Sequence, residues 1–195
     1  MIINNQFFID IRNFLKTLSD KYLLPYAGNL DQLNVTIKDD NSKVTQYDLL
    51  LENQLLSFFN QKGFNNIISE ETNNELLNYK SYLTIDPIDG TKNFIDGVKK
   101  FVIMISFIEN NSSIFSIIYN PSNNNFYHSF KNKIFKNFNI LNNFAYSELI
   151  GYLSNNARLY YKDLISCYRE IPRSRSIVAS AEQAVAGVVQ CFGDQ

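Results

Sequence analysis

The pattern of apolar residues predicts two helices followed by a series of strands. Between residues 7 and 18, apolar side chains recur every three or four positions, the spacing of one helix face. A second helix is predicted from Thr45, as its N-cap, to about Lys62, with Gly63 ending it. Strands are predicted over residues 66–69, 81–85, 101–108, 113–119 and 125–130, the last three as a meander.

Polar segments separate these elements. Residues 41–45, 110–111 and 121–122 are predicted as turns, and the Asn-rich stretches 122–125 and 137–143 as loops. Helices and strands are segregated in blocks, without internal repeats, which favours an α+β fold built in layers.

Candidate functional residues are concentrated in the run Asp86-Pro87-Ile88-Asp89-Gly90-Thr91, which holds two carboxylates three positions apart. Pro87 favours an extended Asp86 and predicts that the strand ends there, so that the carboxylate projects from the sheet edge. Gly90 permits a backbone conformation closed to other residues, and Thr91 is a candidate helix N-cap. Because a helix N-terminus attracts anions, the run could hold a metal beside a phosphate.

Other acidic residues also lie at the predicted ends of apolar elements. They are Asp48 and the pair Glu70-Glu71. If they converge with Asp86 and Asp89, each like-charge pair at 4 Å costs about 4 kcal/mol at an effective dielectric near 20, and a divalent cation would offset it. Simpler interpretations stay open: the Asp-Pro and Asp-Gly pairs are common in turns, and Asp48 could only stabilise a helix N-terminus.

Composition and charge narrow the function classes. At 195 residues, the chain has the length of one domain, and its net charge of −1 gives no electrostatic case for nucleic acid or membrane binding. No apolar run approaches a membrane span, and no signal peptide is recognised. Cys167 and Cys191 match no disulfide or metal pattern, so a reducing, cytoplasmic location is expected. The single histidine, His128, is expected in a structural or surface role.

Three blocks, in order, resemble the inositol monophosphatase family of magnesium-dependent, lithium-sensitive phosphatases. Residues 38–48 read K-D-D-N-S-K-V-T-Q-Y-D and are similar to the family's K-x-D-x-S-P-V-T-x-A-D. Residues 68–71 read I-S-E-E, and residues 85–94 read I-D-P-I-D-G-T-K-N-F, similar to the family's W-V-[IL]-D-P-[IL]-D-G-T-x-N-F. The resemblance is clear from about residue 35 to 130.

The resemblance implies an architecture. It is the family's layered αβαβα sandwich, an α+β fold, as one domain over residues 1–195 with its C-terminal part incomplete. Residues 1–135 would form the metal- and phosphate-binding part, and residues 136–195 a partial C-terminal part. Family members commonly dimerise, so a homodimer is possible.

The resemblance also implies two or three Mg²⁺ ions. Glu70 and Asp86 would hold the first ion with the backbone carbonyl of Ile88. Asp86 would bridge to a second ion, which Asp89 also binds. Oxygen-only ligands suit Mg²⁺.

Catalytic roles follow from the same resemblance. The Thr91 hydroxyl, hydrogen-bonded to Asp48, would orient the attacking water, with Glu70 assisting. The N–H groups of Gly90 and Thr91 would hold the phosphate.

The sequence departs from the family pattern in several places. Lys43 and Tyr47 replace the family's Pro and Ala in the first block. The family's third Asp ligand, in a W-D-x-A-A-G segment, has no counterpart: the chain has no Trp, and neither Asp163 nor Asp194 has that context. We therefore expect an incomplete second metal site. Residues 171–195 contain no Asn or Lys. Within this tail, Ile171-Pro172-Arg173 and Val185-Ala186-Gly187 weakly resemble the family's block before the missing Asp. The alternatives are a frameshifted or joined sequence and an ordinary Ala-rich helix.

The expected function is magnesium-dependent hydrolysis of a small phosphate ester by attack of an activated water. Inositol monophosphate is the favoured substrate, because Asn93-Phe94 is typical of inositol-type members. The alternatives are histidinol phosphate and 3′-phosphoadenosine 5′-phosphate. The nucleotide is considered because Ser69 before Glu70-Glu71 occurs in nucleotidase-type members. A third alternative is an inactive fragment that lacks the third Asp.

Overall fold

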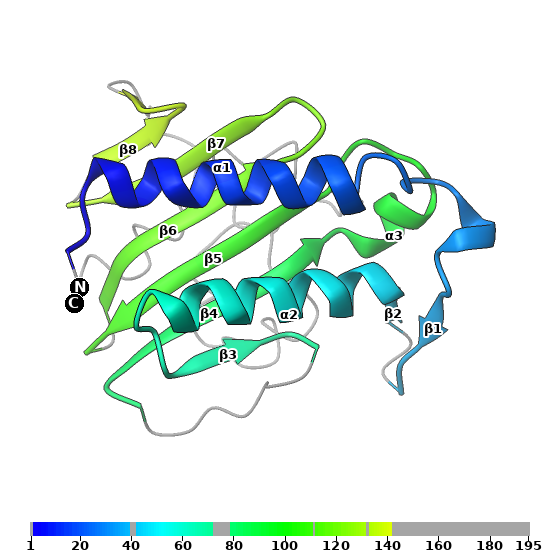
Figure 1. The fold of residues 1–195 in the computed structure, drawn as a ribbon, viewed down its shortest axis with the longest axis horizontal. Coiled ribbons are helices and arrows are strands. Elements are labelled where there is room, and N and C mark those ends of the chain that lie inside the picture. The colour runs from blue at the N-terminus through cyan, green and yellow to red at the C-terminus, as the bar shows by residue number, and fades with distance from the viewer. Residues whose placement is uncertain (1, 40–41, 72–78, 111, 132, 142–195) are drawn as a thin grey trace, which may run out of the picture.

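Two helices cover one face of a seven-stranded sheet (Figure 1). The computed structural model describes residues 2–39, 42–71, 79–110, 112–131 and 133–141. The helices are α1 (Asn5–Tyr22), α2 (Gln46–Gln61) and α3 (Thr91–Ile95), with a 3₁₀ turn at Leu30–Gln32. The strands are β1 (Thr36–Ile37), β2 (Lys43–Val44), β3 (Ile67–Ser69), β4 (Ser81–Asp89), β5 (Val102–Glu109), β6 (Ser112–Asn120), β7 (Asn125–Phe130), β8 (Lys133–Lys136) and β9 (Asn139–Ile140).

The large sheet has the strand order β3-β4-β5-β6-β7-β8-β9. Strand β3 is parallel to β4, and every other neighbouring pair is antiparallel. Strands β1 and β2 form a separate antiparallel pair. Among the described residues, no helix is long and apolar enough to cross a membrane.

Side-chain caps fix where the two long helices begin. The side chain of Asn4 accepts a hydrogen bond from Phe7 N and caps α1. Thr45 caps α2, and Asp48, the third residue of the helix, accepts a hydrogen bond from the backbone N–H of Thr45. This reciprocal arrangement is a capping box. Both predicted helices are therefore confirmed, including Thr45 as N-cap and Gly63 beyond the end of α2.

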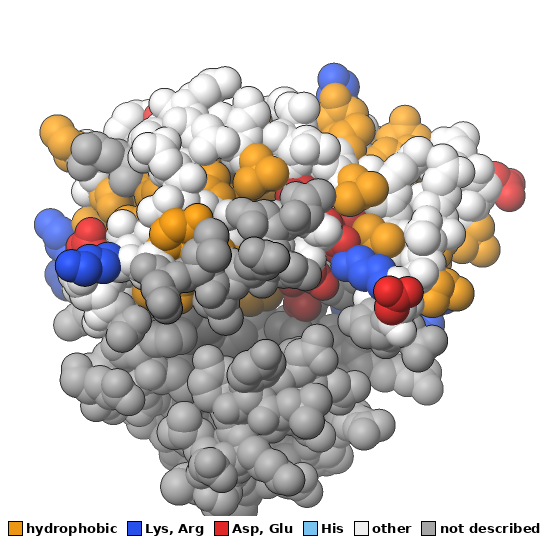
Figure 2. Space-filling view, turned by 90° about the horizontal axis from the view of Figure 1, so that it is seen from below, with side chains coloured by type: hydrophobic (Ala, Val, Ile, Leu, Met, Phe, Trp, Pro, Cys, Tyr) orange, Lys and Arg blue, Asp and Glu red, His pale blue; other side chains and the backbone are white. Residues whose placement is uncertain are grey.

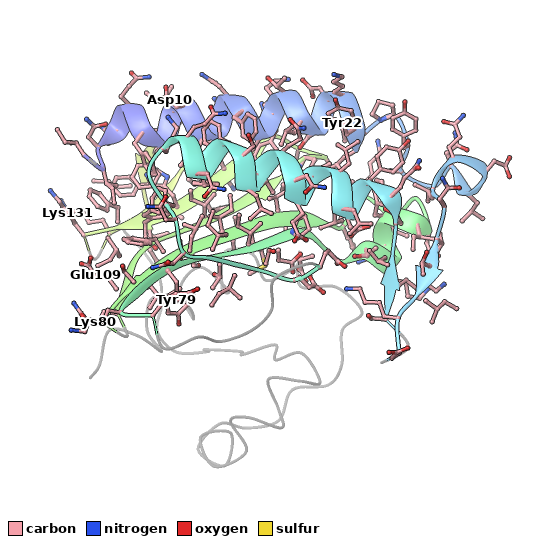
Figure 3. All side chains as sticks on the ribbon, turned by 60° about the horizontal axis from the view of Figure 1, so that its bottom comes forward. Asp10, Tyr22, Tyr79, Lys80, Glu109 and Lys131 are labelled. Carbon is pink, nitrogen blue, oxygen red and sulfur yellow. The ribbon has the colours of Figure 1, made fainter. Side chains whose placement is uncertain are left out.

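Side chains fill the space between the helices and the sheet (Figure 3), and many of those in the core are phenylalanines. Phe8 of α1 contacts Phe115 of β6 edge to face at 5.8 Å, and Phe64 contacts Phe59 of α2 in the same way at 5.6 Å. Such pairs add about 0.5–1.5 kcal/mol each beyond the burial of their area. The core thus anchors both helices to the same sheet face.

Two expectations about the local structure around Asp86 and Thr91 are wrong. Strand β4 does not end at Asp86 but continues through Pro87 to Asp89, with a register shift between the two Asp residues. Proline is tolerated there because a bulge needs no ladder hydrogen bond from it. The helix after β4 begins with Thr91 itself, and Gly90 occupies the N-cap position.

Short strands account for the other differences. Part of the turn predicted at residues 41–45 is β2, and part of the predicted loop at residues 137–143 is β9. Strand β8 was not predicted. Strands of two to four residues are too short to show an alternating pattern.

The remaining strand predictions and the α+β class are confirmed. Residues 142–195, including Asp163, Asp194 and the tail of different composition, lie outside the described residues. The division of the chain at residue 135 stays a prediction.

Candidate active site

The bulge at the end of β4 places two carboxylates beside a left-handed turn. Asp86 pairs with Met104 and Asp89 with Val102, so the chain gains an extra residue between them. The Ile88 N–H donates to Asp86 Oδ1 at 3.1 Å, which fixes the Asp86 side chain. Gly90 then turns the chain at φ +89°, and a Cβ there would lie 3.0 Å from the Lys100 carbonyl oxygen.

Asp48 joins helix α2 to this turn. Its Oδ2 accepts hydrogen bonds from the backbone N–H and the hydroxyl of Thr45, at 2.7 and 2.6 Å. Its Oδ1 lies 3.1 Å from the Thr91 hydroxyl, which lies 2.9 Å from the Ile88 carbonyl oxygen. The single Thr91 proton can be donated to only one of these acceptors at a time. The predicted Asp48–Thr91 contact is therefore present in the structure.

Glu70, Asp86 and Asp89 form a group of like charges. Burial raises the pKa of Asp86 well above its usual value, and the neighbouring Glu70 and Asp89 raise it further. Burial and the Glu70 charge raise the pKa of Asp89 to about 6. Asp and Glu side chains gather near the centre of the face in Figure 2. The arrangement disfavours three negative charges unless a positive charge joins them.

An unsatisfied buried oxygen supports the same conclusion. Asp89 Oδ2 is buried and has no hydrogen-bond partner. A buried oxygen of this kind needs an explanation, such as an ion or a water. The group offers only oxygen donors, which suit Mg²⁺ rather than a softer metal. Among the described residues, no three Asp, Glu, His or Cys side chains are already arranged to hold one ion. The carboxylates therefore fit Mg²⁺ by the type of their donor atoms, and their side chains would have to move to surround an ion.

Two acidic residues beside this group serve other contacts. Glu71 pairs with Lys38 at 2.6 Å, and its carboxylate is almost fully buried. Its backbone N–H donates to Glu52, a buried acid of α2 that was not predicted from the sequence. The only sequence signal for Glu52 is its position one helical turn after Asp48, which places both acids on one face.

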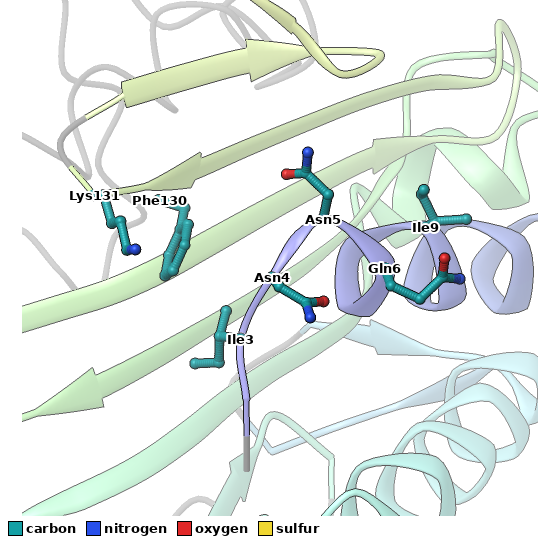
Figure 4. Close-up of a pocket in the computed structure, with 7 residues that line it drawn as sticks. All are labelled: Ile3, Asn4, Asn5, Gln6, Ile9, Phe130 and Lys131. Carbon is teal, nitrogen blue, oxygen red and sulfur yellow. The ribbon is translucent and has the colours of Figure 1, made fainter.

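A shallow groove of about 610 Å³ lies elsewhere on the molecule (Figure 4). Its lining residues come from the start of α1 and the end of β7: Ile3, Asn4, Asn5, Gln6, Ile9, Phe130 and Lys131. None of them belongs to the carboxylate group, and the start of α1 and the helix α3 lie at opposite ends of the sheet in Figure 1. The groove is therefore separate from the candidate active site.

Comparison with known proteins identifies relatives of this chain. The model of the inositol monophosphatase family matches residues 13–162. The chain is 35% identical over 96 residues to the 3′(2′),5′-bisphosphate nucleotidase CysQ of Haemophilus influenzae, covering 46% of this chain and 35% of the relative. It is 31% identical over 124 residues to a fructose-1,6-bisphosphatase/inositol-1-monophosphatase of Methanocaldococcus jannaschii, covering 63% and 48%. The matches thus span about a third to a half of these relatives.

Solved structures share the fold. An IMPase of Thermotoga maritima superposes with a TM-score of 0.63 at 24% identity, over 73% of this chain and 56% of that one. The SuhB protein of Bartonella henselae superposes with a TM-score of 0.65 at 19% identity, over 91% and 72%. An IMPase/NADP phosphatase solved with Mg²⁺ and phosphate superposes with a TM-score of 0.58 at 20% identity, over 68% of this chain and 51% of that one. The expected fold type is confirmed, and the chain belongs to the inositol monophosphatase family.

Proposed function

We propose that this protein is a Mg²⁺-dependent phosphomonoesterase that hydrolyses a small phosphorylated metabolite. The observation that carries the proposal is the group of Glu70, Asp86 and Asp89, with its raised pKa values and the unpartnered Asp89 Oδ2. Family membership supports the reaction class, and a relative of the same fold was solved with Mg²⁺ and phosphate.

The metal ligands would be Glu70, Asp86, Asp89 and the Ile88 carbonyl, with Asp86 shared between two ions. When bound, Mg²⁺ supplies positive charge to the phosphoryl oxygens and the leaving alkoxide and lowers the pKa of a water. The Ile88 carbonyl lies 2.9 Å from the Thr91 hydroxyl, and a carbonyl oxygen has a second lone pair for an ion.

The remaining residues would orient the water and the substrate. When Thr91 donates its proton to Asp48, its hydroxyl oxygen is free to accept a hydrogen bond from the attacking water. Glu70, which is exposed, would accept a proton from that water. The N–H groups of Gly90 and Thr91 open a helix, where they have no partner within the helix, and would bind phosphate oxygens.

Inositol monophosphate is the first candidate substrate, because Asn93-Phe94 is typical of inositol-type members of the family. A specific observation favours a bisphosphate nucleotide as the second. Three curated relatives, including the one at 35% identity, are bisphosphate nucleotidases named CysQ, and Ser69 precedes Glu70-Glu71 in this chain. Histidinol phosphate is the third candidate.

The test is phosphate release by the 195-residue chain across a Mg²⁺ titration, with each candidate substrate offered separately. We expect release that depends on Mg²⁺ and is abolished in Asp86→Asn, and the preferred substrate would identify the subfamily. Folded protein that releases no phosphate at any Mg²⁺ concentration would contradict the proposal and favour the inactive-fragment alternative. Equal turnover by Asp86→Asn would contradict the site.

A further inference from the structure

Glu52 is a fully buried acid on α2, and it contacts both residues that flank Glu70. Its relative exposure is 0%. The Ser69 hydroxyl donates to Oε1 at 2.5 Å, and the Glu71 N–H donates to Oε2 at 3.1 Å. One carboxylate therefore holds the chain immediately before and immediately after Glu70.

These contacts fix the backbone that carries the Glu70 side chain. The Glu70 N–H donates to the Ile85 carbonyl oxygen at 3.2 Å, which ties it to β4. Beyond it, the Glu71 carboxylate pairs with Lys38 at 2.6 Å. The Glu70 carboxylate itself lies close enough to Asp86 to raise the pKa of Asp86. Because the backbone direction sets where a side chain points, the contacts on either side of Glu70 bear on the position of this carboxylate.

A carboxylate is a costly choice for this position. Burying an acid costs several kcal/mol unless hydrogen bonds compensate, and an apolar side chain could pack α2 against β3 without that cost. An apolar side chain could not, however, accept hydrogen bonds from both Ser69 and Glu71. A carboxylate at residue 52 is thus suited to accept hydrogen bonds from the Ser69 hydroxyl and the Glu71 N–H at the same time.

We propose that Glu52 is a positioning residue, which holds the end of β3 so that the Glu70 carboxylate faces Asp86 as part of the cation site. The inference rests on the proposed function, because the effect of Glu52 is exerted through Glu70. Helix α2 would then fix both sides of the site, since Asp48 holds Thr91 and Glu52 holds residues 69–71.

The test compares Glu52→Met, which removes both acceptors, with Glu52→Gln, which keeps the shape. In Glu52→Gln the amide oxygen can still accept from Glu71 N–H, and the amide NH₂ can donate to the Ser69 hydroxyl. Phe59→Leu, a buried change nearer the C-terminal end of the same helix, is the control for general destabilisation. The Mg²⁺ dissociation constant of each folded variant is measured by calorimetry.

We expect Glu52→Met to bind Mg²⁺ about 10- to 100-fold more weakly, the usual effect of losing a residue that orients a metal ligand. Glu52→Gln and Phe59→Leu should stay close to wild type. Wild-type affinity in Glu52→Met, or equal weakening in Phe59→Leu, would overturn the inference. If Glu52→Met does not fold, the double variant Glu52→Gln, Ser69→Ala decides: weaker binding supports the inference, and wild-type affinity overturns it.

Amide hydrogen exchange separates this inference from the proposed function. The N–H of Glu71 should exchange faster in Glu52→Met than in wild type and Phe59→Leu, whether or not the protein binds Mg²⁺. If the wild-type chain binds no Mg²⁺, the proposed function fails on its own, and exchange still reports whether Glu52 holds this segment. Unchanged exchange at Glu71 would overturn the role of Glu52 independently of any metal.

Discussion

The Thr91 hydroxyl lies 3.1 Å from Oδ1 of Asp48, although 43 residues separate them in the sequence. The other oxygen of Asp48 closes the capping box of α2, so one buried carboxylate connects the start of a helix to the turn after β4. Burial raises the pKa of Asp48, while its hydrogen bonds to Thr45 and Thr91 lower it. The Thr91 hydroxyl is therefore held by the core of the domain.

This relationship predicts the effect of removing the hydroxyl. Thr91→Val keeps the shape but leaves nothing to orient a water, so we expect phosphate release to fall about 100-fold or more. Loss of one hydrogen bond should reduce the free energy of unfolding by only about 1 kcal/mol. Rates at saturating Mg²⁺ and urea unfolding measure the two effects. Thr91→Ser is the control and should retain most activity; an active Thr91→Val would exclude Thr91 from the mechanism.

Neutralising Asp86 should stabilise the metal-free protein. Asp86→Asn keeps the acceptor for Ile88 N–H but removes a charge buried beside Glu70 and Asp89. In EDTA at about pH 8, we expect the melting temperature to rise by at least ~2–4 °C, the shift that about 1 kcal/mol produces in a domain of this size. Added Mg²⁺ should raise the melting temperature of wild type and leave that of the variant unchanged. A variant that is stabilised by Mg²⁺ as strongly as wild type would show that Asp86 is not a ligand.

The sequence alone reaches some of these relationships and not others. Asp48 and Thr45 are three residues apart, so a local rule predicts their contact. The approach of Thr91 to Asp48 is not local, and the sequence indicates it only through the family resemblance. Glu52 gives little signal, because an acid within a helix is usually solvent-exposed, and its burial depends on β3 packing across α2.

The same limit explains the error at Pro87. A proline after Asp86 is a sound reason to end a regular strand, but a bulge lets β4 continue to Asp89. Whether a bulge forms depends on the partner strand β5, which local preferences do not describe.

Gly90 should be much less replaceable than Gly63. Both have φ close to +90°, but a Cβ at Gly63 meets nothing within 4 Å, whereas one at Gly90 would lie 3.0 Å from the Lys100 carbonyl oxygen. Gly63→Ala should therefore cost only the conformational strain, about 1–2 kcal/mol. Gly90→Ala should cost about 1–3 kcal/mol more, because backbone must shift. Urea unfolding of both variants measures the difference, and equal losses would show that the turn relaxes without strain.

His128 should make stability depend on pH. The residue is 2% exposed, and its ring stacks on Phe8 at 4.3 Å and on Phe135 at 4.6 Å. Of the structural or surface role expected for it, the structure supports the structural one. Burial lowers the pKa of His128 from 6.5 to about 4, and its Nδ1 has no hydrogen-bond partner. Between these two pKa values the unfolded chain binds the proton more readily than the folded protein. The free energy of unfolding is therefore undiminished by His128 well above pH 6.5, and it falls as the pH drops below that value. The loss between about pH 7 and about pH 5 should be about 2 kcal/mol.

The matched control for this effect is His128→Phe, which keeps an aromatic ring in the stack but cannot be protonated. Asp89, with a pKa of about 6, titrates in the same range with the opposite sign, because a raised carboxyl pKa favours the folded state at low pH. The neighbouring cation on the helix side is Arg12, which lies over the Phe138 ring that also contacts His128. The difference between wild type and His128→Phe in urea unfolding at about pH 5, 6 and 7 therefore isolates the histidine. Parallel pH profiles would mean that His128 is protonated without leaving its aromatic stack.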